Sequence, residues 1–135
     1  MVVDTTECPI QKPSNAQQWK TVYSDYKKQT TLKYEVALSE ERGLPVWVSG
    51  PHNGPKADIK IFREGLKALL QEKGSYAFAD GTYQSEPLYL ITPPRPFKKL
   101  TPTQQEIHRA ISKRRVLIEN FFGQLKGFAS MSMTW

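Results

Sequence analysis

Apolar and polar residues alternate with the period of a β-strand in two stretches of the first half of the chain. Residues 32–38 form the first stretch, and residues 44–49 return as its partner after a polar turn. Val-Val-Asp at residues 2–4 reads as the end of a further strand. The glycines and prolines of residues 50–55 predict a loop. The pattern therefore predicts three strands ahead of the first helix.

Two helices are predicted from apolar residues at helical spacing. The first covers residues 59–70 and stops at Gly74. The second begins after Thr101, where Thr-Pro-Thr-Gln supplies a capping box with proline at the first helical position. Its apolar stripe comprises Ile107, Ile111, Leu117, Ile118, Phe121, Leu125 and Phe128.

Short apolar runs at residues 76–79 and 88–92 predict two more strands, the first of them buried on both faces. The predicted order is strand, strand, strand, helix, strand, strand, helix. This order indicates a mixed α/β domain in which the helical crossover returns a strand to the sheet in parallel.

Length and composition exclude several classes of protein. With 135 residues the chain is expected to form one domain. No run approaches the roughly 20 apolar residues of a membrane helix, and Met-Val-Val-Asp does not open like a signal peptide. A single cysteine excludes an internal disulfide. One cysteine and two histidines are also too few ligands for a Cys/His zinc cluster. We expect an intracellular protein without a membrane partner.

Positive charge is concentrated near the C-terminus. The net charge is +6, and residues 98–126 hold seven basic and two acidic side chains. Such an excess favours a polyanionic partner. The alternative is a solvated helix face.

Three carboxylates occupy positions where a charge is costly: Asp4 and Asp80 end apolar runs, and Glu119 lies in the most apolar part of the last helix. If the strands of Asp4 and Asp80 are parallel neighbours, their side chains emerge at one edge of the sheet. A helix across that edge would add Glu119. Three carboxylates without a dedicated cation are a site for a hard divalent ion such as Mg²⁺.

Each of these residues also has a simpler interpretation. Asp4 could cap a turn, and Asp80 is followed by glycine, a common turn signal. Glu119 could pair with Arg115, four residues earlier on the same helix face. A fourth carboxylate, Asp58, could be an N-terminal helix residue favoured by the dipole.

Five short motifs, in order along the chain, resemble those of DDE-type transposase/nuclease domains of the Harbinger-like and insertion-sequence-like superfamily. The motifs are Val-Asp-Thr-Thr-Glu-Cys-Pro-Ile at 3–10, Tyr-Lys-Lys at 26–28 with Thr-Leu-Lys at 31–33, residues 53–58 with Asn-Gly at the start and Asp58 at the end, Ala-Asp-Gly-Thr-Tyr at 79–83, and residues 112–126 with Arg-Arg-Val-Leu-Ile-Glu at 114–119 and Phe-Gly-Gln-Leu-Lys at 122–126. Family members often carry glycine or alanine where this chain has Thr5.

This resemblance implies a ribonuclease H-like fold and a catalytic triad of Asp4, Asp80 and Glu119. These residues would hold two Mg²⁺ or Mn²⁺ ions, one activating water or a DNA 3′-hydroxyl and the other stabilising the leaving 3′-oxygen. Asp58 matches an acidic position of the family and is taken as accessory. The side chains expected to face the DNA phosphate backbone are Lys27, Lys28, Lys33, Lys113, Arg114, Arg115 and Lys126.

The expected function is metal-dependent DNA cleavage and strand transfer by a single catalytic domain, residues 1–135, without the helix-turn-helix region that usually precedes it. Such a domain would rely on a separate DNA-targeting protein or domain, and could self-associate. Two alternatives stay open: a domesticated, non-catalytic module that binds DNA or protein, and an RNA-cleaving enzyme of the same fold. The expected location is the nucleus in a eukaryote, and otherwise the cytoplasm.

Overall fold

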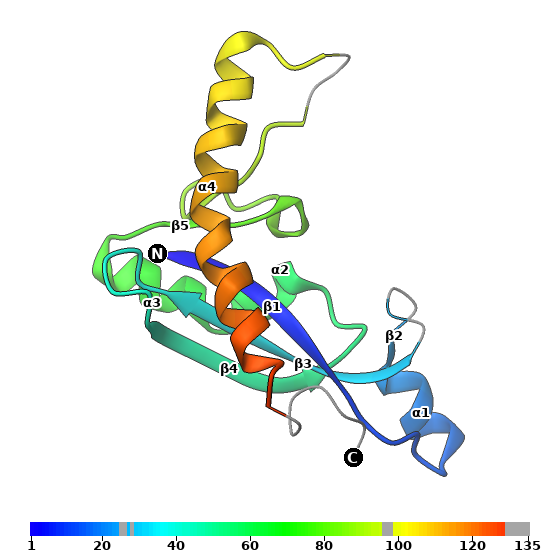
Figure 1. Cartoon of the computed structure of the whole chain (residues 1–135). Helices are drawn as coiled ribbons and strands as arrows, with labels where there is room; N and C mark the ends of the chain where they lie inside the picture. Colours follow the sequence, from blue (N-terminus) through cyan, green and yellow to red (C-terminus); the bar gives the residue numbers. More distant parts are fainter. Residues whose placement is uncertain (25–26, 28, 96–98, 129–135) are drawn as a thin grey trace.

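A computed structural model describes residues 1–24, 27, 29–95 and 99–128, and shows a sheet with helices packed on its two faces (Figure 1). In chain order the elements are β1 (Val2–Pro9), α1 (Ala16–Val22), β2 (Tyr23–Ser24), β3 (Gln29–Leu38), β4 (Pro45–Asn53), α2 (Asp58–Glu64), α3 (Leu66–Lys73), β5 (Ala77–Phe78), the 3₁₀ turn η1 (Gly81–Tyr83), β6 (Leu90–Ile91) and α4 (Pro102–Leu125).

Within the described residues the sheet has six strands in the order β2-β3-β1-β5-β6, with β4 also paired to β3. Strand β3 runs antiparallel to β1 and to β4, whereas β5 is parallel to both β1 and β6. The sheet is therefore mixed, as predicted, and the crossover through α2 and α3 does return a strand in parallel. This mixed α/β architecture is consistent with a ribonuclease H-like fold.

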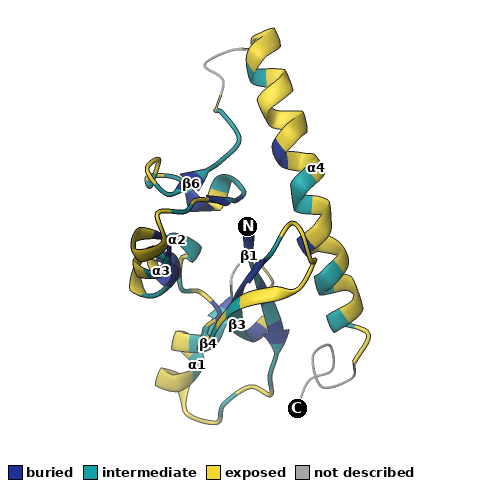
Figure 2. Cartoon of the chain, turned by 90° about the vertical axis from the view of Figure 1, so that its left-hand side faces the viewer, coloured by how far each residue is buried: buried dark blue, intermediate teal, exposed yellow. Residues whose placement is uncertain are grey.

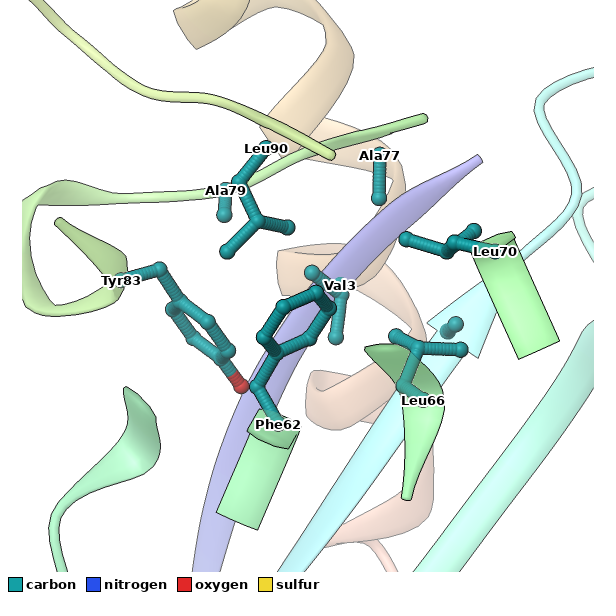
Figure 3. Packing of buried hydrophobic residues seen from close by; sticks show 9 residues of the cluster. Val3, Phe62, Leu66, Leu70, Ala77, Ala79, Tyr83 and Leu90 are labelled. Carbon is teal, nitrogen blue, oxygen red and sulfur yellow. The ribbon is translucent and has the colours of Figure 1, made fainter. Parts of the chain in front are cut away.

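Side chains of β1 alternate between two hydrophobic cores. Val3 packs with Phe62 of α2 and with Leu66 and Leu70 of α3 (Figure 3). Val2 lies in the other core, with Val36 and Leu38 of β3 and Ile118 of α4. Because successive side chains of a strand point to opposite faces, Asp4 follows Val2 toward α4 and Thr5 follows Val3 toward α2.

The helix predicted over residues 59–70 is two helices, and that prediction was wrong at Gly65. Gly65 has φ −141° and ψ −78°, outside the helical region, and joins α2 to α3. A Cβ atom at this position would lie 2.7 Å from the indole of Trp47. The close approach of the Trp47 ring to this backbone therefore accounts for both the glycine and the break.

Two strands are longer than predicted. The expectation that a strand ends at Asp4 was wrong, because β1 continues to Pro9 and pairs with β3 along its whole length. Strand β4 continues through Gly50 and Pro51, where a loop was predicted. Proline is tolerated there because β4, among the strands that the structure describes, pairs with β3 alone and lies at an edge.

Helix α4 begins as predicted, with the Thr101–Gln104 capping box and Pro102 in the first turn. Its first half stands clear of the sheet, and Figure 2 shows this part of the helix mostly exposed. Of the predicted apolar stripe, Ile111 and Ile118 are buried, whereas Ile107 is 42% exposed. The buried part of the helix therefore begins at Ile111 and includes the turns that carry Glu119. No helix in the described part of the chain is long and apolar enough to cross a membrane.

Candidate metal centre and adjoining cleft

Asp4 and Asp80 lie side by side because their strands are parallel neighbours. Val2 of β1 pairs with Phe78 of β5, and each aspartate comes two residues after its member of that pair. Asp58 joins them from the first turn of α2. Oxygen atoms of these three carboxylates lie within 4.8 Å of one another. The predicted convergence of Asp4 and Asp80 at one edge is thus present.

Local hydrogen bonds orient the first two carboxylates. Oδ1 of Asp4 accepts a hydrogen bond from the backbone N–H of Thr5 at 2.8 Å. Oδ1 of Asp80 accepts one from the N–H of Thr82 at 2.9 Å, and it shares the single hydroxyl hydrogen of Thr82 with Asp58. Asp80 therefore caps the 3₁₀ turn, as its simpler interpretation proposed, and still belongs to the cluster. The Oδ2 atoms of Asp4 and Asp80 both lie toward Arg115 of α4.

Asp58 is held by three donors. Its Oδ1 accepts from the Thr5 hydroxyl and from Nζ of Lys33, both at 3.0 Å, and its Oδ2 accepts from the Thr82 hydroxyl at 2.8 Å. The sequence placed Asp58 at the start of a helix but gave it only an accessory role. In the structure it offers an oxygen within 4.8 Å of oxygens of both Asp4 and Asp80, and hydrogen bonds of Thr5 and Thr82 connect it to them.

Glu119 reaches the cluster through Arg115. Nη2 of Arg115 lies 3.8 Å from Asp4 Oδ2, 3.6 Å from Asp80 Oδ2 and 3.7 Å from Glu119 Oε1. Because all three oxygens surround the same Nη2 atom, any two of them are separated by at most twice 3.8 Å, which is 7.6 Å. The Glu119 side chain is 55% exposed, so the argument from the cost of burial was wrong for this residue. Its simpler interpretation, pairing with Arg115 along the helix, is present.

The electrostatics of the cluster favour a further cation. Burial, followed by the neighbouring charge of Asp80, raises the pKa of Asp4 from an ordinary value of 3.8 to about 7, against the opposing effects of the Thr5 N–H and Arg115. Asp4 is therefore poorly compensated in its ionised form. A set of close carboxylate oxygens short of positive charge fits a hard divalent ion such as Mg²⁺ or Mn²⁺.

A cleft of about 970 Å³ adjoins the cluster. Its lining includes Asp4, Asp58 and Asp80 together with four lysines, Lys27, Lys33, Lys56 and Lys126. A surface that joins acidic metal ligands to several cations can place an anionic chain against a metal. The lysines of the cleft come from β3, from α4's C-terminal end and from two loops, so the sheet edge assembles them from distant parts of the sequence.

Comparison with known proteins identifies the family. The profile of a family described as DDE superfamily endonuclease matches residues 3–134. The chain belongs to this family. No curated protein and no solved structure gives a match. Membership supports a function of nuclease or transposase type, use of a divalent metal, and DNA as the class of substrate.

The basic residues predicted for this DDE endonuclease domain divide into two groups. Lys27, Lys33 and Lys126 line the cleft, and Lys126 also donates to the carbonyl of Glu7. On α4, Lys113 is exposed and the neighbouring arginines form ion pairs, Arg114 with Glu40 and Arg115 with the carboxylates. Lys28 lies outside the described residues. Sequence analysis missed Lys56, although it stands between Gly54 and Asp58 within a recognised motif.

A buried carboxylate, Glu35, was also missed. It is fully buried on β3 and accepts hydrogen bonds from Trp47 Nε1 and from the hydroxyl of Tyr83, both at 3.1 Å. Burial raises the pKa of Glu35 to about 7 despite these two donors. Tyr83 ends the 3₁₀ turn that Asp80 caps, so Glu35 anchors that turn from within the core of the DDE domain. Period-two alternation gives no sign that Glu35 is buried, because it does not reveal that β3 is covered on both sides.

Proposed function

We propose that this chain is the catalytic domain of a metal-dependent DNA endonuclease or transposase, with Asp4, Asp80 and Glu119 as metal ligands. The observation that carries the proposal is the convergence of Asp4, Asp58 and Asp80 beside a lysine-lined cleft. Bound Mg²⁺ or Mn²⁺ ions would activate the attacking hydroxyl and stabilise the leaving 3′-oxygen.

Asp4 and Asp80 would hold the metal through their Oδ2 atoms, since each Oδ1 already accepts a hydrogen bond from a backbone N–H. Glu119 approaches the same space from α4. Asp58 orients the hydroxyls of Thr5 and Thr82, which flank the two ligands. In this proposal Asp58 positions neighbouring side chains and is not itself a metal ligand.

The lysines of the cleft bind phosphates on either side of the scissile bond. Attack by a water oxygen forms a new bond to phosphorus and breaks the bond to the 3′-oxygen, which takes up a proton. The products are a 5′-phosphate and a 3′-hydroxyl. When a DNA 3′-hydroxyl replaces water, the same exchange joins two strands. Acting on chromosomal DNA, such a domain would work in the nucleus of a eukaryotic cell.

A non-catalytic DNA-binding module is the second candidate. It is favoured by the ion pairs of Arg115 with Asp4, Asp80 and Glu119, because these pairs supply the carboxylates with a counter-charge from the chain itself. A module of this kind would bind DNA through the cleft lysines and would have no requirement for a metal.

Nicking of supercoiled plasmid separates the two candidates. The wild type should nick DNA in Mg²⁺ or Mn²⁺ and not in EDTA, and Asp80→Asn should be slower by at least about 100-fold because the metal loses a ligand. Glu72→Gln, an exposed carboxylate of α3, is the matched control and should retain wild-type activity. Binding without metal-dependent nicking would establish the non-catalytic module. A structured RNA assayed in parallel tests the third interpretation.

A further inference from the structure

Arg115 lies at the point shared by the three proposed ligands. Its Nη2 atom is within 3.8 Å of the Oδ2 atoms of Asp4 and Asp80 and of Oε1 of Glu119. In Asp4 and Asp80 the backbone N–H groups bond to Oδ1, so Oδ2 is the oxygen that stays available to a metal. A metal bridging Asp4, Asp80 and Glu119 would need the space that this guanidinium occupies.

Ion pairs, and no hydrogen bond within the described residues, connect Arg115 to these carboxylates. All three distances exceed 3.5 Å, which is too long for hydrogen bonds. The Nε atom of Arg115 is buried and has no hydrogen-bond partner within the described part of the chain. Buried donors are ordinarily paired, and hydrogen bonds fix the position of a guanidinium. The guanidinium of Arg115 lacks such bonds and is therefore weakly held.

The preceding residue, Arg114, shows how α4 seats an arginine firmly. Its Nε lies 3.0 Å from Glu40, its Nη1 donates to the carbonyl of Ala110 at 3.1 Å, and its guanidinium stacks over Phe78 at 4.6 Å. Two arginines adjacent in sequence thus differ sharply in how they are held. Arg115 is the less firmly held of the two, and it is the one that another cation at the carboxylates can displace.

We propose that Arg115 is a resident cation of the metal centre, which a divalent ion must displace, and that its departure frees Glu119 to become a ligand. The inference rests on the proposed function. A guanidinium and a divalent ion cannot share one space, because like charges at about 4 Å repel strongly in a half-buried site. A single positive charge leaves three carboxylates undercompensated, whereas a divalent ion compensates them more fully.

Displacement couples metal binding to the conformation of α4's side chains. Without metal, Arg115 lowers the repulsion among the carboxylates and stabilises the fold. With metal, Arg115 leaves and Glu119 loses its partner along the helix. The apparent metal affinity is therefore reduced by the work of displacing Arg115, as for any protein whose binding-competent state is only a fraction of the population.

The test is the affinity for Mn²⁺, measured from the electron paramagnetic resonance signal of free Mn²⁺ in titrations of the purified chain. Arg115→Gln should bind Mn²⁺ about tenfold more tightly than the wild type. Arg114→Gln removes the same charge from the next residue and should stay within about twofold. Arg115→Lys keeps the charge on a shorter side chain and should fall between wild type and Arg115→Gln, so it serves if Arg115→Gln fails to fold.

Glu119→Gln adds a second readout. It should weaken Mn²⁺ binding more in the Arg115→Gln background than in the wild type, because in the wild type the same change also loosens the competing arginine. Weaker binding by Arg115→Gln, or an equal change in Arg114→Gln, would overturn the inference and leave the metal site intact. Absence of Mn²⁺ binding in every variant would overturn the proposed function as well.

Discussion

Replacing Asp4 with asparagine should stabilise the protein in the absence of metal. The Asp4 side chain is only 17% exposed, and its burial beside Asp80 raises its pKa from 3.8 to about 7. A shift of about three pKa units corresponds to about 4 kcal/mol of unfavourable free energy in the ionised form. Asparagine keeps the size of the side chain and an oxygen that can accept from the N–H of Thr5, but it carries no charge.

The pH dependence gives the sign of the effect. Below pH 3.8 Asp4 is protonated in both the folded and the unfolded chain, and it costs nothing. Between pH 3.8 and about 7 the unfolded chain releases this proton first, so the wild type loses stability as the pH rises. The advantage of Asp4→Asn should therefore be small at pH 4 and approach about 4 kcal/mol at pH 8.

Urea unfolding at pH 4, 6 and 8, with and without Mn²⁺, measures this difference. Metal narrows this difference: at a concentration 100 times the dissociation constant it stabilises the wild type by about 2.7 kcal/mol, against an advantage of about 4 kcal/mol for the variant without metal, while Asp4→Asn should gain much less from metal. Glu72→Gln is the control, since it removes an exposed carboxylate. If Asp4→Asn is less stable than the wild type at pH 8 without metal, Arg115 compensates Asp4 fully and the reasoning about burial fails.

Three further results are expected. Folded Glu35 holds its proton up to a pKa of about 7, so the wild type should lose about 3 kcal/mol of unfolding free energy between pH 4.5 and 7, and Glu35→Gln should not lose it. Parallel curves of unfolding free energy against pH for the two proteins would contradict this. Lys56→Ala should lower the log–log salt slope of duplex DNA binding by about 0.9, and Lys73→Ala, which lies outside the cleft, should leave it unchanged; equal slopes would exclude the cleft as the DNA surface. Ile118→Ala should cost about 2–5 kcal/mol in urea unfolding, since Ile118 is fully buried between α4 and the sheet, and a loss below about 1 kcal/mol would show that α4 docks through other contacts.

The pairing of Asp4 with Asp80 could be predicted from sequence because it follows from chain direction alone. A helical crossover returns a strand in parallel, and residues at equivalent positions along parallel neighbours lie side by side, as Asp4 and Asp80 do two residues after the Val2–Phe78 pair. The start of α4 could also be predicted from sequence, since a capping box and a proline at the first helical position are local signals.

The position of Asp58 and the behaviour of Arg115 could not be predicted in this way. Asp58 reaches the cluster through hydroxyls of Thr5 and Thr82, which no periodicity distinguishes from surface threonines. In the sequence Arg115 is one of three consecutive basic residues that were predicted to contact DNA phosphates. Only the three-dimensional approach of α4 to the sheet edge shows that Arg115 and Arg114, adjacent in sequence, meet different partners.

The length of β1 was misjudged for a related reason. The apolar run stops at Val3 and the residues after Asp4 show no clear alternation, yet Thr6 and Cys8 are buried and β1 pairs with β3 as far as Pro9. Hydrogen bonding along the ladder sustains a strand whose side chains give a weak apolar signal. The proposed metal ligand Asp4 thus lies within a strand and not at its end.

Anomalous diffraction from crystals grown with Mn²⁺ tests the central claim most directly. The account predicts an anomalous peak about 2.0–2.2 Å from Oδ2 of Asp4 and Oδ2 of Asp80, with the Arg115 side chain moved away from its present position. Crystals of Asp80→Asn should lack the peak. A wild-type crystal with Arg115 still among the carboxylates and no manganese at Asp4 and Asp80 would contradict the account.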